Sequence, residues 1–293
     1  MLYKKQKING LAELVERVND SDISSIKNIV SGIIQMINDP RSNVKNLSEI
    51  IQIDPPLSSR VLRLANSAFY SPPKKIGEIV RAIIWVGYDA IKELALSQKV
   101  CQLLKIDEYS QGYSRMSLWK HCISVAMLSK MLYRREYGER GDNIYAAGLL
   151  HDIGLIIMDQ FCRHEFSEII HKLNEGEKDI ISIERELLGF DHAELARAVM
   201  ESWNIPTELC IAIGGHHDPL NVDPKYYKMA MTLFVTDSYC QKSGRGFTDS
   251  AVIDMATYET CLNSLKTSKI VLDMIMEDTE EEIHKMEQEG FFS

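Results

Sequence analysis

Histidine and aspartate residues interrupt several segments of this chain whose other residues are apolar. The clearest case is His151 with Asp152, which directly follows the small and apolar run YAAGLL. A buried aspartate is costly unless a cation or hydrogen-bond donors compensate its charge. The other interruptions are spread along the chain: His121, His192, His216, His217 and Asp237. Imidazole and carboxylate groups bind Fe, Mn, Zn or Ni, so the sequence predicts a site for one or two divalent transition-metal ions of undetermined identity.

Each of these residues also has an interpretation without a metal. A single buried histidine such as His121 is more often a hydrogen-bonded core residue than a ligand. His192 follows Asp191 and precedes Glu194, an arrangement typical of an ordinary first helical turn. The His151 and Asp152 pair would then be a buried polar pair without chemistry. The number of such residues in apolar contexts favours the metal site.

The spacing of the paired residues places them at helix ends. Neighbouring residues on a helix point about 100° apart, so His151 and Asp152 can reach one ion most easily where a helix stops. Gly154 permits such an end. His216 and His217 follow two glycines and precede Asp218 and Pro219, which is a second predicted helix stop.

Almost every long segment repeats apolar residues with helical period, and none alternates as a strand does, so the predicted class is all-α. The stretch SSIKNIVSGIIQMINDP predicts one helix, and IGEIVRAIIWVGYDAIKELALSQKVCQLL predicts two, separated near Gly87. In DPPLSSRVLRLANSAFYSPP, Asp54 is expected to cap a helix that stops at Ser71 and the prolines after it. The buried face of that helix is predicted to comprise Leu57, Val61, Leu64, Ala65 and Ala68.

Polar stretches suggest where the chain divides. Residues 105–117 and 242–251 are polar and contain glycine, which is typical of boundaries. We therefore expect an N-terminal extension (1–22), an N-terminal helical lobe (23–115), a helical bundle (116–243) and a C-terminal helical segment (244–293). The acidic stretch EDTEEEIHKMEQEG near the end is expected to be a solvated helix face or a fraying tail rather than a tail that binds a partner.

Composition narrows the class of protein. The chain has 33 Lys and Arg against 42 Asp and Glu, a net charge of −9, which argues against general nucleic-acid binding. We expect a cytoplasmic protein, because no apolar run approaches the length of a membrane span and the N-terminus lacks the apolar core of a signal peptide. The six cysteines form no CxxC pair, so we expect reduced thiols without disulfides.

The order His121, His151 with Asp152, then Asp237 resembles the metal-ligand signature of the HD superfamily of phosphohydrolases. The segment DPPLSSRVLRLANSAFY, followed by IGEIVRAIIWVG, is similar to the signature of the HDOD family, the HD-related output domains of bacterial signalling proteins. The resemblance extends from about residue 23 to about residue 243. It implies an N-terminal helical lobe packed on an HD-like bundle, and a role in signal transduction through contacts with other signalling proteins.

Three further residues, His192, His216 and His217, resemble the additional histidines of the two-metal HD-GYP branch, which hydrolyses cyclic diguanylate. That branch usually carries a lysine where this chain has Leu155, and the chain has no GYP motif. The resemblance therefore implies two functions, of which we favour a regulatory output module. The alternative is a metal-dependent phosphohydrolase acting on a nucleotide or cyclic dinucleotide, with Asp152 bridging two ions.

Two smaller sets of residues have conditional roles. A phosphate-bearing substrate needs cationic donors, for which the candidates are Lys120, Lys130 and Arg197. Asn66 and Ser67, beside the apolar face of their helix, are expected either to form the seam between the lobes or to satisfy the neighbouring turn.

Overall fold

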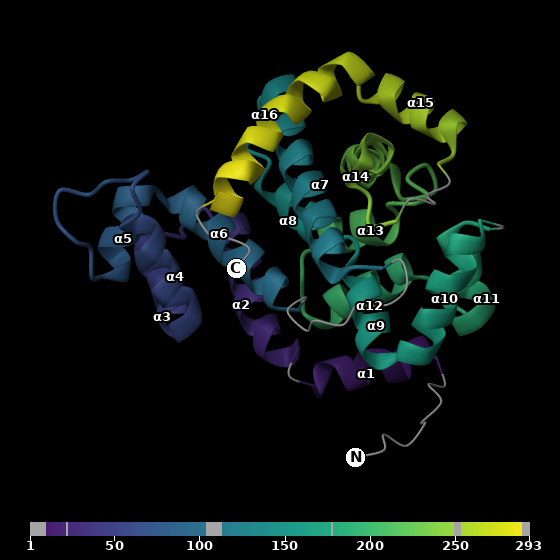
Figure 1. Cartoon of the computed structure of the whole chain (residues 1–293), viewed down its shortest axis with the longest axis horizontal. Helices are drawn as coiled ribbons and strands as arrows, with labels where there is room; N and C mark the ends of the chain where they lie inside the picture. Colours follow the sequence, from purple (N-terminus) through teal and green to yellow (C-terminus); the bar gives the residue numbers. More distant parts are fainter. Residues whose placement is uncertain (1–9, 22, 104–112, 177, 249–252, 289–293) are drawn as a thin grey trace.

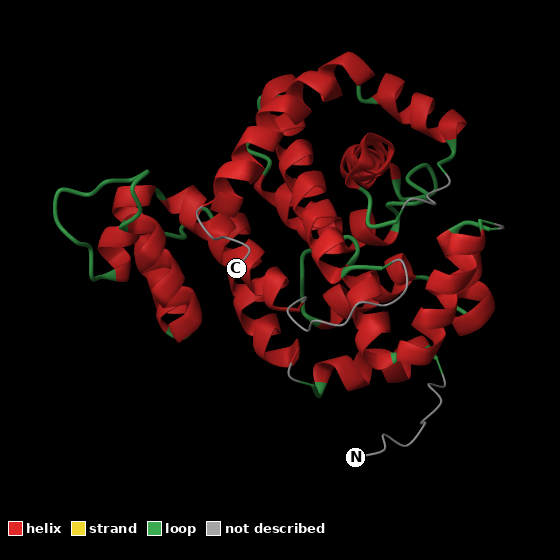
Figure 2. Cartoon of the chain, viewed as in Figure 1, coloured by secondary structure: helices red, strands yellow, loops and turns green. Residues whose placement is uncertain are grey.

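The computed structural model describes residues 10–21, 23–103, 113–176, 178–248 and 253–288, and over these residues the chain is helical without a sheet (Figure 2). The all-α prediction is therefore confirmed. The N-terminal part contains α1 (Leu11–Asn19), α2 (Ile23–Asn38), α3 (Val44–Gln52), α4 (Pro55–Ala65), α5 (Ile79–Val86) and α6 (Tyr88–Leu103). The middle part contains α7 (Arg115–Glu136), α8 (Asp142–Leu150), α9 (Ile153–Phe161), α10 (Arg163–Glu175), α11 (Ile180–Leu188), α12 (His192–Ser202), α13 (Thr207–Gly214), η1 (Pro224–Tyr226), α14 (Tyr227–Cys240) and η2 (Gln241–Arg245). Two helices follow, α15 (Met255–Ser264) and α16 (Lys269–Gln288).

Helix α7 is the axis of the bundle, and α8, α14 and α16 pack against it (Figure 1). Its side chains are buried on almost every side, which explains why its sequence is apolar without a single stripe. Helix α8 comes close to α7 at Gly148, where an added Cβ would lie 2.6 Å from the Cα of Ala126. The small residues of YAAGLL therefore allow the contact that brings His151 to the centre of the bundle.

Helices α3, α4 and α5 project from one side of the molecule and join the rest through α2 and α6 (Figure 1). The predicted cap is confirmed, because the Asp54 carboxylate accepts a hydrogen bond of 2.8 Å from the Leu57 backbone amide. Gly87 separates α5 from α6 with φ of +112°, a conformation that favours glycine. The predicted end of α4 was wrong, because the helix stops at Ala65 and Ala68 is exposed.

Asn66 explains the early end of α4. Its side-chain amide donates to the carbonyl oxygens of Leu62 (2.7 Å) and Ile76 (2.8 Å) and accepts from the Ile76 amide (2.8 Å). These bonds tie the loop after α4 back to its last turn. The Ser67 hydroxyl is buried and has no hydrogen-bond partner among the described residues. The contacts of Asn66 thus match local satisfaction of the turn rather than a seam between lobes.

A polar seam between the N-terminal helices and the bundle lies elsewhere, at the end of α12. The Ser31 hydroxyl donates to the Trp203 carbonyl (3.0 Å), and the Lys27 ammonium donates to the Ser202 carbonyl (3.1 Å). The Trp203 indole donates to the Asn19 side chain (3.1 Å). Helix α1 also packs on α12 through Leu14 and Val18, which are fully buried, so this part of the expected extension belongs to the core.

One continuous hydrophobic core extends from α1 to α16 and does not divide at the expected boundaries. The division into four segments therefore remains a prediction. The first expected boundary falls largely on 104–112, and the second partly on 249–252, outside the described residues. The described part of the acidic stretch lies on α16 as a helix, with Asp278 paired to Arg135 and Glu280 paired to Arg245. All six cysteines are free and buried, as expected for reduced thiols.

One stretch of helix, Asp142–Phe161, is long and apolar enough to span a membrane by length and composition alone. No apolar run of this length was expected from the sequence, and this stretch of 20 residues is longer than expected. It comprises α8 and α9, and 89% of its apolar window is buried inside the fold. Its composition is therefore that of a core element.

Replacing Asn66 with alanine tests the local role of this residue. The Asn66→Ala variant removes three hydrogen bonds and leaves the Ile76 backbone groups without their partner, so we expect a loss of about 1–3 kcal/mol in stability. Chemical denaturation measures this loss, and metal content should not change. The control is Asn263→Ala, which changes an exposed asparagine of α15. A variant that unfolds like the wild type would contradict the role of Asn66.

Candidate metal centre

Six elements bring the seven predicted residues together at the centre of the bundle. His121 lies in the middle of α7 and Asp237 in α14, whereas His192 is the first residue of α12. The other four lie at helix ends, as predicted. His151 ends α8 and Asp152 precedes α9, while His216 and His217 follow the end of α13. Apart from His217, which is partly buried, all of these side chains are buried.

The carboxylate of Asp152 divides the residues into two groups. Its Oδ2 lies 3.2 Å from His151 Nε2 and 3.6 Å from His121 Nε2. Its Oδ1 lies 3.3 Å from His192 Nε2 and 3.6 Å from His216 Nε2. Each carboxylate oxygen thus has its own pair of imidazoles.

A further residue completes each group. Asp237 Oδ1 lies 3.0 Å from His121 Nε2, and His217 Nε2 lies 2.9 Å from His192 Nε2. Possible donor atoms lie within 4.8 Å of one another in the set Asp152, His192, His216 and His217, and likewise in the set His121, His151 and Asp237. Both groups have the composition and spacing of a transition-metal site, with Asp152 between them.

Backbone carbonyls orient three of the imidazoles. The Nδ1 atoms of His121, His151 and His216 lie 3.0, 2.8 and 2.6 Å from the carbonyl oxygens of Arg245, Gly148 and Ile213. A carbonyl only accepts, so Nδ1 carries a proton in each case, and in the neutral imidazole Nε2 then presents a lone pair. These three Nε2 atoms are buried and have no hydrogen-bond partner in the described part of the chain. Unsatisfied buried lone pairs turned toward carboxylates fit a bound cation.

Glu184 of α11 holds the fourth imidazole and was missed by the sequence analysis. Its Oε2 accepts from the Nδ1 of His192 (2.8 Å) and from the His192 backbone amide (2.9 Å), and its side chain is fully buried. Burial alone lowers the pKa of His192, but Glu184 and Asp152 outweigh burial and raise the pKa well above its usual value. Such carboxylate partners orient metal-binding histidines and increase their basicity. Only the packing of α11 on this site distinguishes Glu184 from the exposed glutamates near it.

Cys122 lies close to His151 and Asp152, and the three form another set of possible donors. Burial, together with the neighbouring carboxylates of Asp152 and Asp237, raises the pKa of this thiol well above its usual value. Without a bound cation the thiol is therefore protonated, which makes Cys122 a poorer ligand than the imidazoles.

A cavity of about 160 Å³ reaches the centre, with Asp152, His192, His217 and Asp237 among its lining residues. Its other lining includes apolar side chains and the carboxylates of Asp179 and Asp254, but no described lysine or arginine. The three candidate cationic donors lie elsewhere. Lys120 lines a different cavity, Lys130 pairs with Glu93, and Arg197 pairs with Glu201 at 2.8 Å. The expectation that these three serve this site was therefore wrong.

A domain model of the HDOD family matches residues 23–219, about two thirds of the chain. The chain belongs to the HDOD family. The match confirms the family expected from the Asp54 to Tyr70 segment and its continuation, and it includes His121, His151, Asp152, His192 and both His216 and His217.

Solved structures share this fold. An HDOD domain protein of unknown function from Geobacter sulfurreducens is 26% identical, with a TM-score of 0.71 over 94% of this chain and 95% of that one. A protein provisionally named a signal transduction protein, from Marinobacter aquaeolei VT8, is 21% identical with a TM-score of 0.74, over 96% of this chain and 64% of that one. A provisionally named phosphohydrolase from Shewanella amazonensis SB2B is 22% identical with a TM-score of 0.67, over 96% of both chains.

A curated protein from Treponema pallidum (strain Nichols) is 24% identical over 228 residues, which cover 76% of this HDOD chain. The matched segment spans only 42% of that relative's own length.

The Glu184→Gln variant tests the partner of His192. Glutamine keeps the size of the side chain but removes the charge, so we expect metal affinity to fall by roughly 10- to 100-fold. Competition with a chromophoric chelator measures this affinity. Glu186→Gln changes an exposed glutamate of the same helix and should bind metal as the wild type does. Equal affinity in both variants would refute the role of Glu184.

The Gly154→Ala variant tests how closely the two halves of the centre approach. An added Cβ would lie 2.0 Å from the His192 carbonyl oxygen, so α9 and α12 must separate. We expect a loss of about 1–3 kcal/mol or more in stability, together with weaker metal binding. The control is Gly77→Ala, because no atom lies within 4 Å of a Cβ at Gly77. Denaturation with and without metal compares the two variants, and an unchanged Gly154→Ala variant would contradict this packing.

Proposed function

We propose that this HDOD protein is a metal-binding regulatory module of bacterial signal transduction that acts in the cytoplasm through contacts with signalling proteins. The convergence of six ligand-type side chains around the Asp152 carboxylate carries the metal half of this proposal. One ion would be held by His121, His151, Asp152 and Asp237. A second would be held by Asp152, His192, His216 and His217. The donor set suits a divalent transition metal such as Fe, Mn, Zn or Ni.

The surface of α3–α5 supports the role in protein contacts. Five of the nine large apolar side chains exposed in the described part of the chain lie on these helices or their loops: Ile53, Phe69, Val80, Ile84 and Trp85. Exposed basic side chains accompany them on the same elements, at Arg63, Lys74, Lys75 and Arg81. A projecting surface of this kind suits an acidic partner protein with an apolar centre.

The cavity at the centre favours regulation over hydrolysis of a large anion. It is small, and no described lysine or arginine lines it, so the chain itself offers no cation to a phosphodiester there. Leu155, fully buried, occupies the position where the HD-GYP branch usually has its lysine.

A phosphohydrolase remains the second candidate, because the cavity reaches residues of both groups. Bound ions would supply a more acidic water and stabilise charge on phosphoryl oxygens. In that case Asp152 and the imidazoles would orient the ions, and the small cavity would admit one phosphoester of a nucleotide or cyclic dinucleotide at a time.

The His151→Ala variant tests the metal centre. Protein purified without a metal-affinity column should contain about one or two equivalents of a transition metal by elemental analysis, and the variant should lose at least the ion nearest His121. His171→Ala is the control, because that histidine is 71% exposed and pairs with Glu175. Equal metal content in the wild type and His151→Ala would refute the centre.

The same preparations separate the two functions. A phosphodiester screen of the loaded wild type should show no turnover above that of the chelated protein. Turnover that Asp152→Ala abolishes would instead establish the phosphohydrolase.

The Ile84→Glu variant tests the protein contact. Cross-linking of the loaded protein in its own cells should capture a partner with the wild type and lose it with the variant, because the variant places a charge in an apolar contact. The control is Ile270→Glu, which alters an apolar side chain on α16 that is 72% exposed. If the two variants capture the same partner, α3–α5 is not the contact surface.

A further inference from the structure

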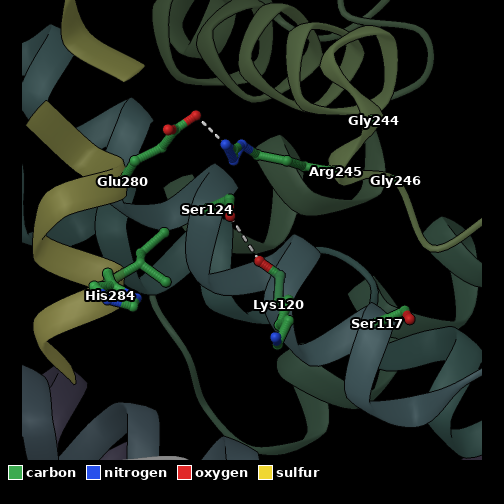
Figure 3. Close-up of a pocket in the computed structure, with 9 residues that line it drawn as sticks. Ser117, Lys120, Ser124, Gly244, Arg245, Gly246, Glu280 and His284 are labelled. Carbon is green, nitrogen blue, oxygen red and sulfur yellow. Dashed lines mark hydrogen bonds and ion pairs between the residues drawn. The ribbon is translucent and has the colours of Figure 1, made fainter. Parts of the chain in front are cut away.

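A second and larger cavity is lined by none of the seven residues that form the centre. It has a volume of about 430 Å³, within the range of roughly 300–1,000 Å³ typical of small-molecule sites. It lies between α7, α16 and the chain that ends η2 (Figure 3). Its polar lining comes from Ser117, Lys120, Ser124, Arg245, Glu280 and His284.

The lining has the chemistry of an anion site. Lys120 and Arg245 come from different elements and supply two cations, and the Ser117 hydroxyl supplies a polar group. Glu280 is the single carboxylate among the lining residues, in a protein whose net charge is −9. Arginine, lysine and hydroxyl groups together are typical of phosphate recognition. The cavity above the metal centre has no such cations among its lining residues.

Arg245 is only partly satisfied. Its guanidinium pairs with Glu280 (Figure 3), but the side chains are 28% and 51% exposed. Ion pairs this exposed contribute little to stability, so an incoming anion can replace Glu280. The Arg245 Nε is buried and has no hydrogen-bond partner among the described residues. A ligand oxygen beside this Nε would supply the acceptor that the described residues do not.

The wall of this cavity also touches the metal centre. The Arg245 carbonyl accepts from the His121 imidazole (3.0 Å), and the Gln241 amide donates to Asp237 Oδ1 (3.1 Å). Gln241 and Arg245, at the two ends of η2, thus bind Asp237 and His121, which belong to the same group of possible metal ligands. Between them Gly244 has φ of +75°, and Gly244 and Gly246 line the cavity without side chains.

We propose that this cavity binds a small phosphorylated molecule on Lys120 and Arg245, in exchange for Glu280, and that η2 transmits its occupancy to His121. The first claim, that the cavity binds the ligand, is the binding half and is independent of the metal centre proposed above. The second claim, that η2 transmits occupancy to His121, is the transmitted half and rests on that proposed centre.

Calorimetry on metal-free protein tests the binding half. The probes are inorganic phosphate, inorganic pyrophosphate and a panel of nucleoside monophosphates, titrated into chelator-treated wild type and into Asp152→Ala, so that no metal binds the probe. We expect saturable binding of at least one probe to both proteins. Binding of inorganic phosphate alone would identify a free-anion site, and tighter binding of a nucleotide would identify a nucleotide site.

Matched variants locate the bound probe. Lys120→Ala and Arg245→Ala should each weaken binding about tenfold or more, whereas Arg197→Ala, which removes an arginine of α12 that does not line this cavity, should not. Glu280→Gln should bind more tightly because the competing charge is gone, and Glu282→Gln on the same helix should bind as the wild type does. The proposal is overturned if no probe binds, or if binding survives both Lys120→Ala and Arg245→Ala.

Metal affinity tests the transmitted half. The Kd of the wild type for Mn²⁺ should change about fivefold or more in the presence of the bound probe, and the Kd for the probe should change by the same factor when Mn²⁺ is bound. Lys120→Ala should show no such change, which excludes complexes between Mn²⁺ and the probe in solution. An unchanged Mn²⁺ affinity of the wild type overturns the link, and a wild type that binds no Mn²⁺ refutes the metal centre while the binding half stands.

Discussion

The rest of the centre is arranged around one buried negative charge, the carboxylate of Asp152. Its side chain is 3% exposed, and four imidazoles from different elements approach its two oxygens. Burial raises the pKa of this carboxyl, but the histidines outweigh burial and hold the pKa well below its usual value. The carboxylate is therefore ionised and requires compensation, and helices α7, α8, α12 and α13 end or pass where neighbouring histidines can provide it.

The backbone determines how the imidazoles face this charge. Carbonyl oxygens hold a proton of three histidines on the outer nitrogen, which leaves the Nε2 atom of each to face a carboxylate. A cation bound there would be stabilised by the Nε2 lone pairs and by the carboxylate together. His192 is oriented in the same way, but its Nδ1 donates to the Glu184 carboxylate, which is a stronger acceptor than a backbone carbonyl. The fold thus gathers nitrogen and oxygen ligands where one or two cations would be stabilised.

Much of this arrangement could be predicted from the sequence, because it depends on local patterns. Periodicity predicted an all-α fold, the Asp-Pro-Pro run predicted the start of α4, and the glycines near His216 predicted a helix end. Polar residues in apolar runs identified all seven side chains that converge. Other features depend on packing between distant segments and left no local signal. The end of α4 is set by a bond from Asn66 to Ile76, ten residues on, and Glu184 looks like any surface glutamate until the fold brings it to His192. The seam at Ser31 and Trp203 joins positions 172 residues apart in sequence.

The ligand-type residues extend from position 121 to position 237, and the carbonyl that orients the first of them belongs to residue 245. No short segment of the chain contains one complete group. The group with His121 and Asp237 cannot assemble before α14 has docked on α7, and the other group requires α9, α12 and α13 to pack together. Closing loops of this length costs entropy before any contact repays it, which makes the centre a late product of folding. A cation that binds there would stabilise the tertiary arrangement of the entire bundle rather than any single helix. Occupancy of the centre would then distinguish molecules whose bundle has folded from molecules whose bundle has not.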